Sequence, residues 1–181
     1  MTIALFAVTA AGRRAAAEVA GPLGARPHEL SELAGIWPDL DAAVFFLATG
    51  ATVRLIAPLL ADKHTDPGVV CVDEARRFAV ALAGGHGGGA NALAERVAGL
   101  LGATPVVTTA SDATGSTGLD ELVELLDATV DGDLAAAGAA LLDGTAAVDN
   151  PLGFPLPALP AAARPRHRIA VTDRSADPAD T

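Results

Sequence analysis

The feature that most constrains the fold is a set of short apolar runs that do not alternate with polar residues. Strands that are covered on both faces carry such runs. We expect the strands Ile3–Thr9, Ala42–Leu47, Val69–Val72, Phe78–Leu82, Pro105–Thr109 and Arg168–Thr172. Segments with apolar residues at helical spacing separate them, and the expected helices are Ala10–Leu23, Leu30–Ile36, Ala51–Leu60, Ala90–Leu101, Leu119–Leu126 and Asp131–Leu142. This alternation predicts a sheet with helices on both faces.

One pair of strands breaks the alternation. Only the residues 73–77 separate Val69–Val72 from Phe78–Leu82, and so short a connection joins antiparallel strands. The fold class that we expect is therefore α/β: a three-layer, mostly parallel sheet with one β-hairpin, Rossmann-like, plus a small C-terminal α/β segment.

The composition of the sequence changes near residue 128. An Ala-rich helical pattern is followed by a stretch with five prolines, which favours extended or linker structure: Pro151, Pro155, Pro157, Pro160 and Pro165. We expect an N-terminal α/β domain over residues 1–128 and, over 129–181, a partial central region with a Pro-rich linker.

Charge and cysteine content narrow the classes of function. The chain has 12 Lys and Arg against 22 Asp and Glu, a net charge of −10, which disfavours binding to nucleic acid or to an anionic membrane. The uncharged stretches are too short for a spanning helix. The single Cys71 excludes an internal disulfide and a Cys-rich zinc site and agrees with a reducing cytosol, so we expect a cytoplasmic protein.

The most distinctive motif is the Gly-rich segment 84–89, which lies between an expected strand and an expected helix. Glycines let a backbone approach a ligand closely, and the N–H groups of a helix's first turn favour an anion. His86 could act there as a general base near neutral pH. The candidate binding residues of this motif are Gly85, Gly87, Gly88, Gly89 and Asn91. The alternative is a flexible turn that merely tolerates glycine.

The same segment matches a relaxed dinucleotide fingerprint, Gly85-x-Gly87-x-x-Ala90. The acidic residue that such a site needs about 20 residues further on is replaced by Thr108 and Thr109. A nucleotide-binding α/β domain therefore stays open as an alternative, and a P-loop is absent.

Three further polar turns adjoin expected strands. Thr49, Gly50 and Arg54 follow one strand, and Arg54 could hold a carboxylate or be an exposed helix cation. The loop 61–67 contains Lys63 and Asp66 and could face a substrate or only solvent. Its acids and His64 are too close together for one metal ion, so we expect no protein metal site.

The third of these turns contains Thr108, Thr109 and Asp112. Asp112 could assist catalysis or serve only as a helix cap or turn residue. We expect all these turns to converge with the Gly-rich segment on a single pocket.

In their order along the chain, these motifs resemble the CbiG family of cobalamin biosynthesis, the cobalt-precorrin-5A hydrolases. The resemblance covers the N-terminal and central regions of that family and rests on these segments: 45–50, 54–60, 62–67, 69–74, 85–91 and 105–112. The sequence departs from the family pattern at Gly84, where a Ser is usual, and at Gly87, where a larger residue is usual. A further C-terminal domain of full-length members has no counterpart in the sequence.

The resemblance implies hydrolysis of the ring-A δ-lactone of cobalt-precorrin-5A with release of acetaldehyde. For this reaction we expect His86 to orient or activate water, the N–H groups of Gly87–Gly89 to face the lactone oxygen, and Asp66 or Asp112 to assist proton transfer. Arg54 and Lys63 would meet the peripheral carboxylates of the substrate.

The resemblance also bears on cofactors and partners. No cofactor is expected, since the cobalt is carried by the cobalt-precorrin substrate. The expected partners are a fused or separate methyltransferase or the missing C-terminal domain. The alternative within the same family is a non-catalytic tetrapyrrole-binding module of a split or fused cobalamin-biosynthesis protein.

Overall fold

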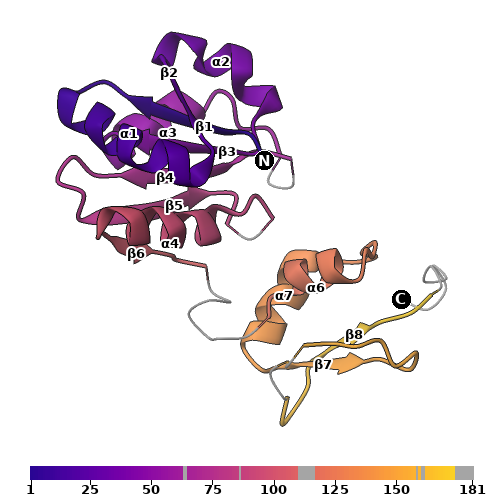
Figure 1. The fold of residues 1–181 in the computed structure, drawn as a ribbon. Helices are drawn as coiled ribbons and strands as arrows, with labels where there is room; N and C mark the ends of the chain where they lie inside the picture. The colour runs from indigo at the N-terminus through magenta and orange to yellow at the C-terminus, as the bar shows by residue number, and fades with distance from the viewer. Residues whose placement is uncertain (63–64, 86, 110–116, 158, 160–161, 174–181) are drawn as a thin grey trace. The chain divides into compact units, whose positions relative to one another are not determined.

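The computed structural model describes residues 1–62, 65–85, 87–109, 117–157, 159 and 162–173 (Figure 1). Contacts divide the chain into two compact units, Met1–Val107 and Thr108–Thr181.

The first unit is built on a six-stranded sheet with the strand order β2-β1-β3-β4-β5-β6. The strands are β1 (Ile3–Ala7), β2 (Arg26–His28), β3 (Ala42–Phe46), β4 (Gly68–Val72), β5 (Phe78–Ala83) and β6 (Thr104–Val106). The helices are α1 (Ala10–Leu23), α2 (Leu33–Ile36), α3 (Thr49–Ile56) and α4 (Ala90–Leu101), and the 3₁₀ turns Leu30–Glu32 and Trp37–Asp39 flank α2. All neighbouring strands are parallel except β4 and β5, so the predicted α/β class with one hairpin is confirmed.

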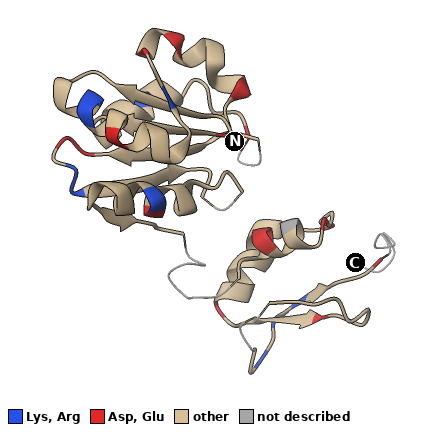
Figure 2. Cartoon of the chain, in the orientation of Figure 1, with Lys and Arg blue, Asp and Glu red and all other residues tan. Residues whose placement is uncertain are grey.

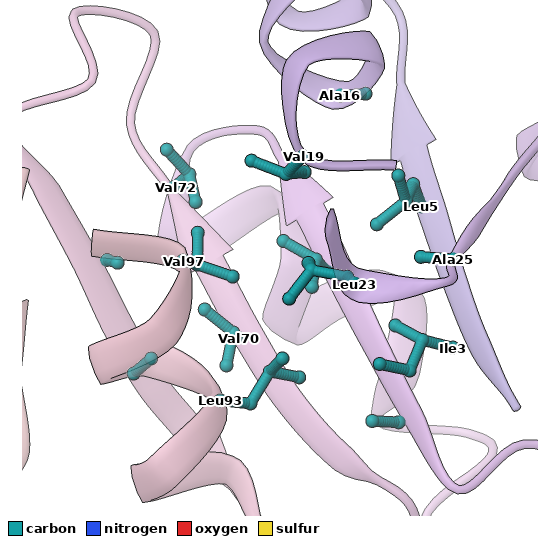
Figure 3. Close-up of a cluster of buried hydrophobic side chains, with 14 of the residues drawn as sticks. Ile3, Leu5, Ala16, Val19, Leu23, Ala25, Val70, Val72, Leu93 and Val97 are labelled. Atoms are coloured by element: carbon teal, nitrogen blue, oxygen red, sulfur yellow. The ribbon is translucent and has the colours of Figure 1, made fainter. Parts of the chain in front are cut away.

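Two apolar clusters place helices on both faces of this sheet, as the three-layer prediction requires. On one face, α1 and α4 pack over the strands; Figure 3 shows Val19 and Leu23 of α1 and Val97 of α4 beside Val70 of β4. On the other face, α2 and α3 cover a second cluster that includes the stacked rings of Phe6 and Phe45. The small residues of α1 and α4 let the helices approach the sheet closely.

The ends of α1 show why the helix occupies these residues. The Thr9 side chain accepts a hydrogen bond of 2.9 Å from the Gly12 N–H, which satisfies one free donor of the first turn. The helix stops at Gly24, which has φ +64°, a conformation that costs glycine least.

The hairpin between β4 and β5 reverses the direction of the chain. Val70 lies opposite Ala81 and Cys71 opposite Val80 in an antiparallel ladder. Within the turn, Arg76 forms a 2.7 Å ion pair with Glu18 of α1. Because of the reversal, the carboxyl end of β5 lies at the same end of the sheet as the amino ends of β1, β3 and β4.

The second unit contains the helices α6 (Leu119–Leu125) and α7 (Leu134–Leu142) and a two-stranded parallel sheet, β7 (Ala146–Asp149) with β8 (His167–Ala170). Its core is formed by Leu119 and Leu122 of α6 together with buried residues of α7 and β7. The Pro-rich stretch that we predicted as a linker joins two paired strands of this unit.

The boundary between the units lies earlier than the expected one at 128–129. Residues of α6 pack with those of α7, so α6 is grouped with the second unit. The expected strand Pro105–Thr109 is shorter in the structure and ends at Val106. Among the described residues, no helix is long and apolar enough to cross a membrane.

The turn of the hairpin yields a prediction about pH. Burial raises the pKa of Asp73. Hydrogen bonds from the Phe78 N–H and from the side chain and N–H of Arg77 lower this pKa, as does the positive charge of Arg77, and together they outweigh the effect of burial. The net effect is a lowered pKa. Such a carboxylate stabilises the fold above its unfolded pKa of about 3.9, and this stability is lost as pH falls through the folded pKa.

We therefore expect Asp73→Asn to lower the free energy of unfolding by about 1 kcal/mol at pH 7, with a difference from wild type that shrinks below pH 4. Urea unfolding followed by circular dichroism from pH 7 to pH 3 measures it. Asp39→Asn, at an exposed carboxylate outside the hairpin, is the control. If the difference in unfolding free energy between Asp73→Asn and wild type stayed constant over this pH range, the lowered pKa of Asp73 would be contradicted.

Candidate functional site

Two of the predicted polar segments meet at the amino end of β4. The loop 61–67 leads into β4, and the Gly-rich segment follows β5, whose last residue Ala83 lies opposite Val69. Gly68 stands between them, and its N–H donates a 3.0 Å hydrogen bond to the carbonyl of Asp41 at the start of β3. We call this region the amino-edge site and define it as the loops 61–67 and 84–91 with Gly68.

Three glycines hold the two loops of this site together by backbone contact. A Cβ atom at Gly68 would lie 2.1 Å from the Gly88 carbonyl oxygen, and one at Gly88 would lie 2.8 Å from the Gly84 oxygen. Gly84 adopts φ +67°, and a Cβ there would lie 3.0 Å from the Cα of Gly68. Gly68 was not among the predicted site residues, although its position directly before an apolar strand and beside a Pro could have indicated a close backbone approach.

The start of α4 differs from the expected anion site. The N–H groups of Ala90 and Asn91 donate to the carbonyls of Gly84 and Gly85, at 3.0 and 3.1 Å. These two donors of the first turn are therefore occupied, which argues against a phosphate at this helix as a dinucleotide fingerprint would require. Asn91 is only 8% exposed, so its side chain offers little surface to a ligand.

The residues just before α4 are more open. No Cβ built at Gly87 or Gly89 would meet another atom within 4 Å. Among the described residues, the N–H groups of Gly87, Gly88 and Gly89 donate to no other group. These three N–H groups are the donors of the amino-edge site that could meet an anionic oxygen.

Asp66 has a clear structural partner within its own loop, 61–67. Both of its carboxylate oxygens lie 3.0 Å from the N–H of Ala61, and its own N–H donates to the Asp62 carbonyl at 2.8 Å. The carboxylate is half-buried and closes the loop that enters β4.

Thr49, Gly50 and Arg54 lie at the other end of the parallel strands. The Thr49 hydroxyl donates to the Cys71 sulfur at 3.7 Å, beside the carboxyl end of β4. Arg54 Nη1 donates to the Gly50 carbonyl at 2.8 Å, so its side chain folds back toward the start of α3. These residues form a second group, which we call the carboxyl-edge group.

The expectation of a single pocket is wrong for these two groups. Gly68 of the amino-edge site pairs with Ala42, and Cys71, beside the carboxyl-edge group, pairs with Phe45. Three residues of β4, about 10 Å, therefore separate the two groups along the strand. The reason is the hairpin: the segment after β5 lies at the opposite edge from the segment after β3.

The remaining predicted site residues lie in the second unit or outside the described residues. Lys63, His86 and Asp112 lie outside the described residues. Thr108 is exposed and Thr109 half-buried, and both belong to the second unit. Within the described ranges, no three metal-ligating side chains are grouped so that they could hold an ion.

A cavity of about 250 Å³ beside β1 and β2 was not anticipated. Its polar side chains bind one another or the backbone: Arg13 donates to the carbonyls of Ala7 and Val8, and Glu32 accepts from the Glu29 N–H and lies 3.4 Å from His28 Nδ1. Because these polar side chains already have partners within the protein, their presence in the cavity does not indicate a ligand.

Comparison with known proteins relates part of the chain to one family. Residues 31–112 match the family described as cobalamin synthesis G N-terminal. The chain is 49% identical over 87 residues to the cobalt-precorrin-5A hydrolase of Salmonella typhimurium, which covers 48% of this chain and 25% of that protein. It is 44% identical over 80 residues to the protein of the same name from Priestia megaterium, covering 44% of this chain and 21% of the relative.

The chain thus spans about a quarter of the length of the curated relatives that it matches. A crystal structure of a putative cobalamin biosynthesis protein G homolog from Sulfolobus solfataricus superimposes with a TM-score of 0.52 at 21% identity. The match covers 97% of this chain and 56% of that one, and it supports the fold.

The glycine contacts predict a specific sensitivity. We expect Gly68→Ala to lower the free energy of unfolding by about 1–3 kcal/mol and to shift the amide signals of residues 84–91 in proton–nitrogen spectra, since the new methyl group must displace the Gly88 carbonyl. Gly99→Ala on the exposed face of α4, where a Cβ meets nothing within 4 Å, is the matched control and should stabilise by up to about 1 kcal/mol. Equal behaviour of the two variants would contradict the backbone contact.

Proposed function

We propose that this chain acts in cobalamin biosynthesis as a cobalt-precorrin-5A hydrolase, because residues 31–112 match the family described as cobalamin synthesis G N-terminal and similar proteins carry that name. The reaction is hydrolysis of the ring-A δ-lactone of cobalt-precorrin-5A with release of acetaldehyde. The observation that carries the proposal is that the matched residues 31–112 include both loops of the amino-edge site.

The chemistry of lactone opening requires a base and an anion site. A base removes a proton from the attacking water, and hydrogen-bond donors stabilise the negative charge that develops on the lactone oxygen. In the proposal, His86 is the base. The N–H groups of Gly87, Gly88 and Gly89 are the donors, and their freedom from other described acceptors supports this role.

The backbone contacts explain how so glycine-rich a loop could serve catalysis. An oxyanion site works because its donors are fixed before the reaction begins. The close approach of Gly68, Gly84 and Gly88 restrains both ends of the segment around position 86. Asp66, which closes the loop 61–67 through the Ala61 N–H, is proposed to assist proton transfer. Lys63 is proposed to meet the substrate's peripheral carboxylates.

The carboxyl-edge group receives a different role in this proposal. Because Thr49, Gly50 and Arg54 lie at the other edge of the sheet, they do not contact the reacting lactone. Arg54 has an exposed side chain with further N–H donors and is proposed to meet carboxylates of the substrate away from the reacting ring. The protein uses no cofactor of its own, and the cobalt enters and leaves with the substrate.

The proposal predicts acetaldehyde release by the purified chain. Incubation with cobalt-precorrin-5A without oxygen, followed by an acetaldehyde assay, measures it. We expect His86→Ala to lower the rate by about 10²–10⁴-fold, with the circular dichroism spectrum unchanged. His28→Ala, at a histidine on β2 outside the amino-edge site, is the matched control and should retain the wild-type rate.

The outcomes separate the alternatives. Tight binding of the substrate without acetaldehyde would contradict hydrolysis and support a tetrapyrrole-binding module that acts with another polypeptide. Full turnover by His86→Ala would remove the base assignment while leaving the reaction in place.

A further inference from the structure

The second unit contains an unusual concentration of positive charge. Residues 108–163 include no Lys or Arg, whereas Arg164, Arg166 and Arg168 follow within five positions, with His167 between them. All four side chains are exposed, and none takes part in an ion pair among the described residues. In Figure 2 the blue of Lys and Arg marks the segment that leads into β8 and the strand itself. We call the residues 164–168 the basic strip.

The basic strip lies on a strand with an unpaired edge. Within the described part of the chain, β8 pairs only with β7. The His167 N–H donates to the carbonyl of Thr145, directly before β7, at 3.2 Å, and the Val171 N–H donates to the carbonyl of Asp149, the last residue of β7, at 2.8 Å. Because hydrogen-bonding directions alternate along a strand, the N–H and C=O groups of Arg168 and Ala170 point away from β7.

The side chains of β8 divide between two faces of this small sheet. Ile169 lies opposite Val148, and both pack against the apolar cluster beneath α6 and α7. Arg168 lies opposite Ala147 and therefore on the other face. A partner strand along β8 would meet outward backbone groups in its plane and the Arg168 guanidinium on the open face.

From this arrangement we propose that the edge of β8 is a docking site for an extended, acidic segment of another polypeptide, which pairs with the outward groups of Arg168 and Ala170. Unpaired edge strands are templates for strand addition. Opposite charges across a strand pair stabilise it, and like charges destabilise it.

The charge also decides between partners. A second copy of the chain would place its own basic strip against this one, so that arginines face arginines, which is unfavourable. An acidic strand satisfies the same backbone groups and pairs with the arginines as well. The edge therefore favours a partner of different sequence and opposite charge.

The test uses the full chain and two synthetic probes, ten-residue peptides in which Val alternates with Glu or with Lys. We expect the Glu peptide to shift the amide signals of Arg168 and Ala170 in proton–nitrogen spectra and to slow their hydrogen exchange, and the Lys peptide to bind at least about tenfold more weakly. Ala170→Pro, which removes an outward N–H and leaves the β7 ladder its donors, should abolish binding of the Glu peptide.

A charge reversal keeps the test independent of any effect of proline on folding. The variant with Arg166→Glu and Arg168→Glu should exchange the preference and bind the Lys peptide more tightly than the Glu peptide. Equal binding of both peptides by wild type, or binding that leaves the β8 amides unchanged, would overturn the proposal. So would a dimer in sedimentation experiments that Ala170→Pro dissociates, since a second copy would then occupy the edge.

Discussion

The reversal of the chain at the β4–β5 hairpin determines where everything after it lies. Asp73 accepts hydrogen bonds from the N–H groups of Arg77 and Phe78, and this turn sends β5 back beside β4. The segment after β5 thereby reaches the amino ends of β3 and β4, where the chain enters from the loop 61–67. Without the reversal, the Gly-rich segment would lie with Thr49 at the carboxyl ends, where open α/β sheets usually bind ligands.

In the Gly-rich segment 84–89, some glycines are required for close backbone packing, and others leave backbone N–H groups open for the proposed reaction. Gly84 and Gly88 are small because the backbone of Gly68 passes against them, whereas Gly87 and Gly89 face open space. A substitution at the first pair would displace the chain, and a substitution at the second pair would cover the N–H groups that the proposed reaction uses. The two readings of the motif, a tight turn and a binding loop, therefore apply to different glycines.

Sequence patterns anticipated the buried elements of the fold and missed two short strands, β2 and β7. The runs around Phe45 and Val70 are apolar because both faces of the sheet are covered. By contrast, β2 contains Pro27 and exposed side chains, and β7 is half-exposed, so neither carries a buried strand's pattern. The helix expected at Ala51–Leu60 ends at Ile56, because Pro58 cannot donate the next helical hydrogen bond.

The misplaced pocket has a cause that was visible in the sequence itself. The convergence of all the polar turns assumed that loops after strands share one edge, which holds only while the strands are parallel. The predicted hairpin already implied that the loop after Phe78–Leu82 changes edge. The position of Gly68 beside Pro67 and before an apolar strand could indicate a close backbone approach, but no sequence pattern identifies Gly88 as the residue that it contacts. The site's position thus follows from topology, and its rigidity follows from backbone packing that only the folded chain displays.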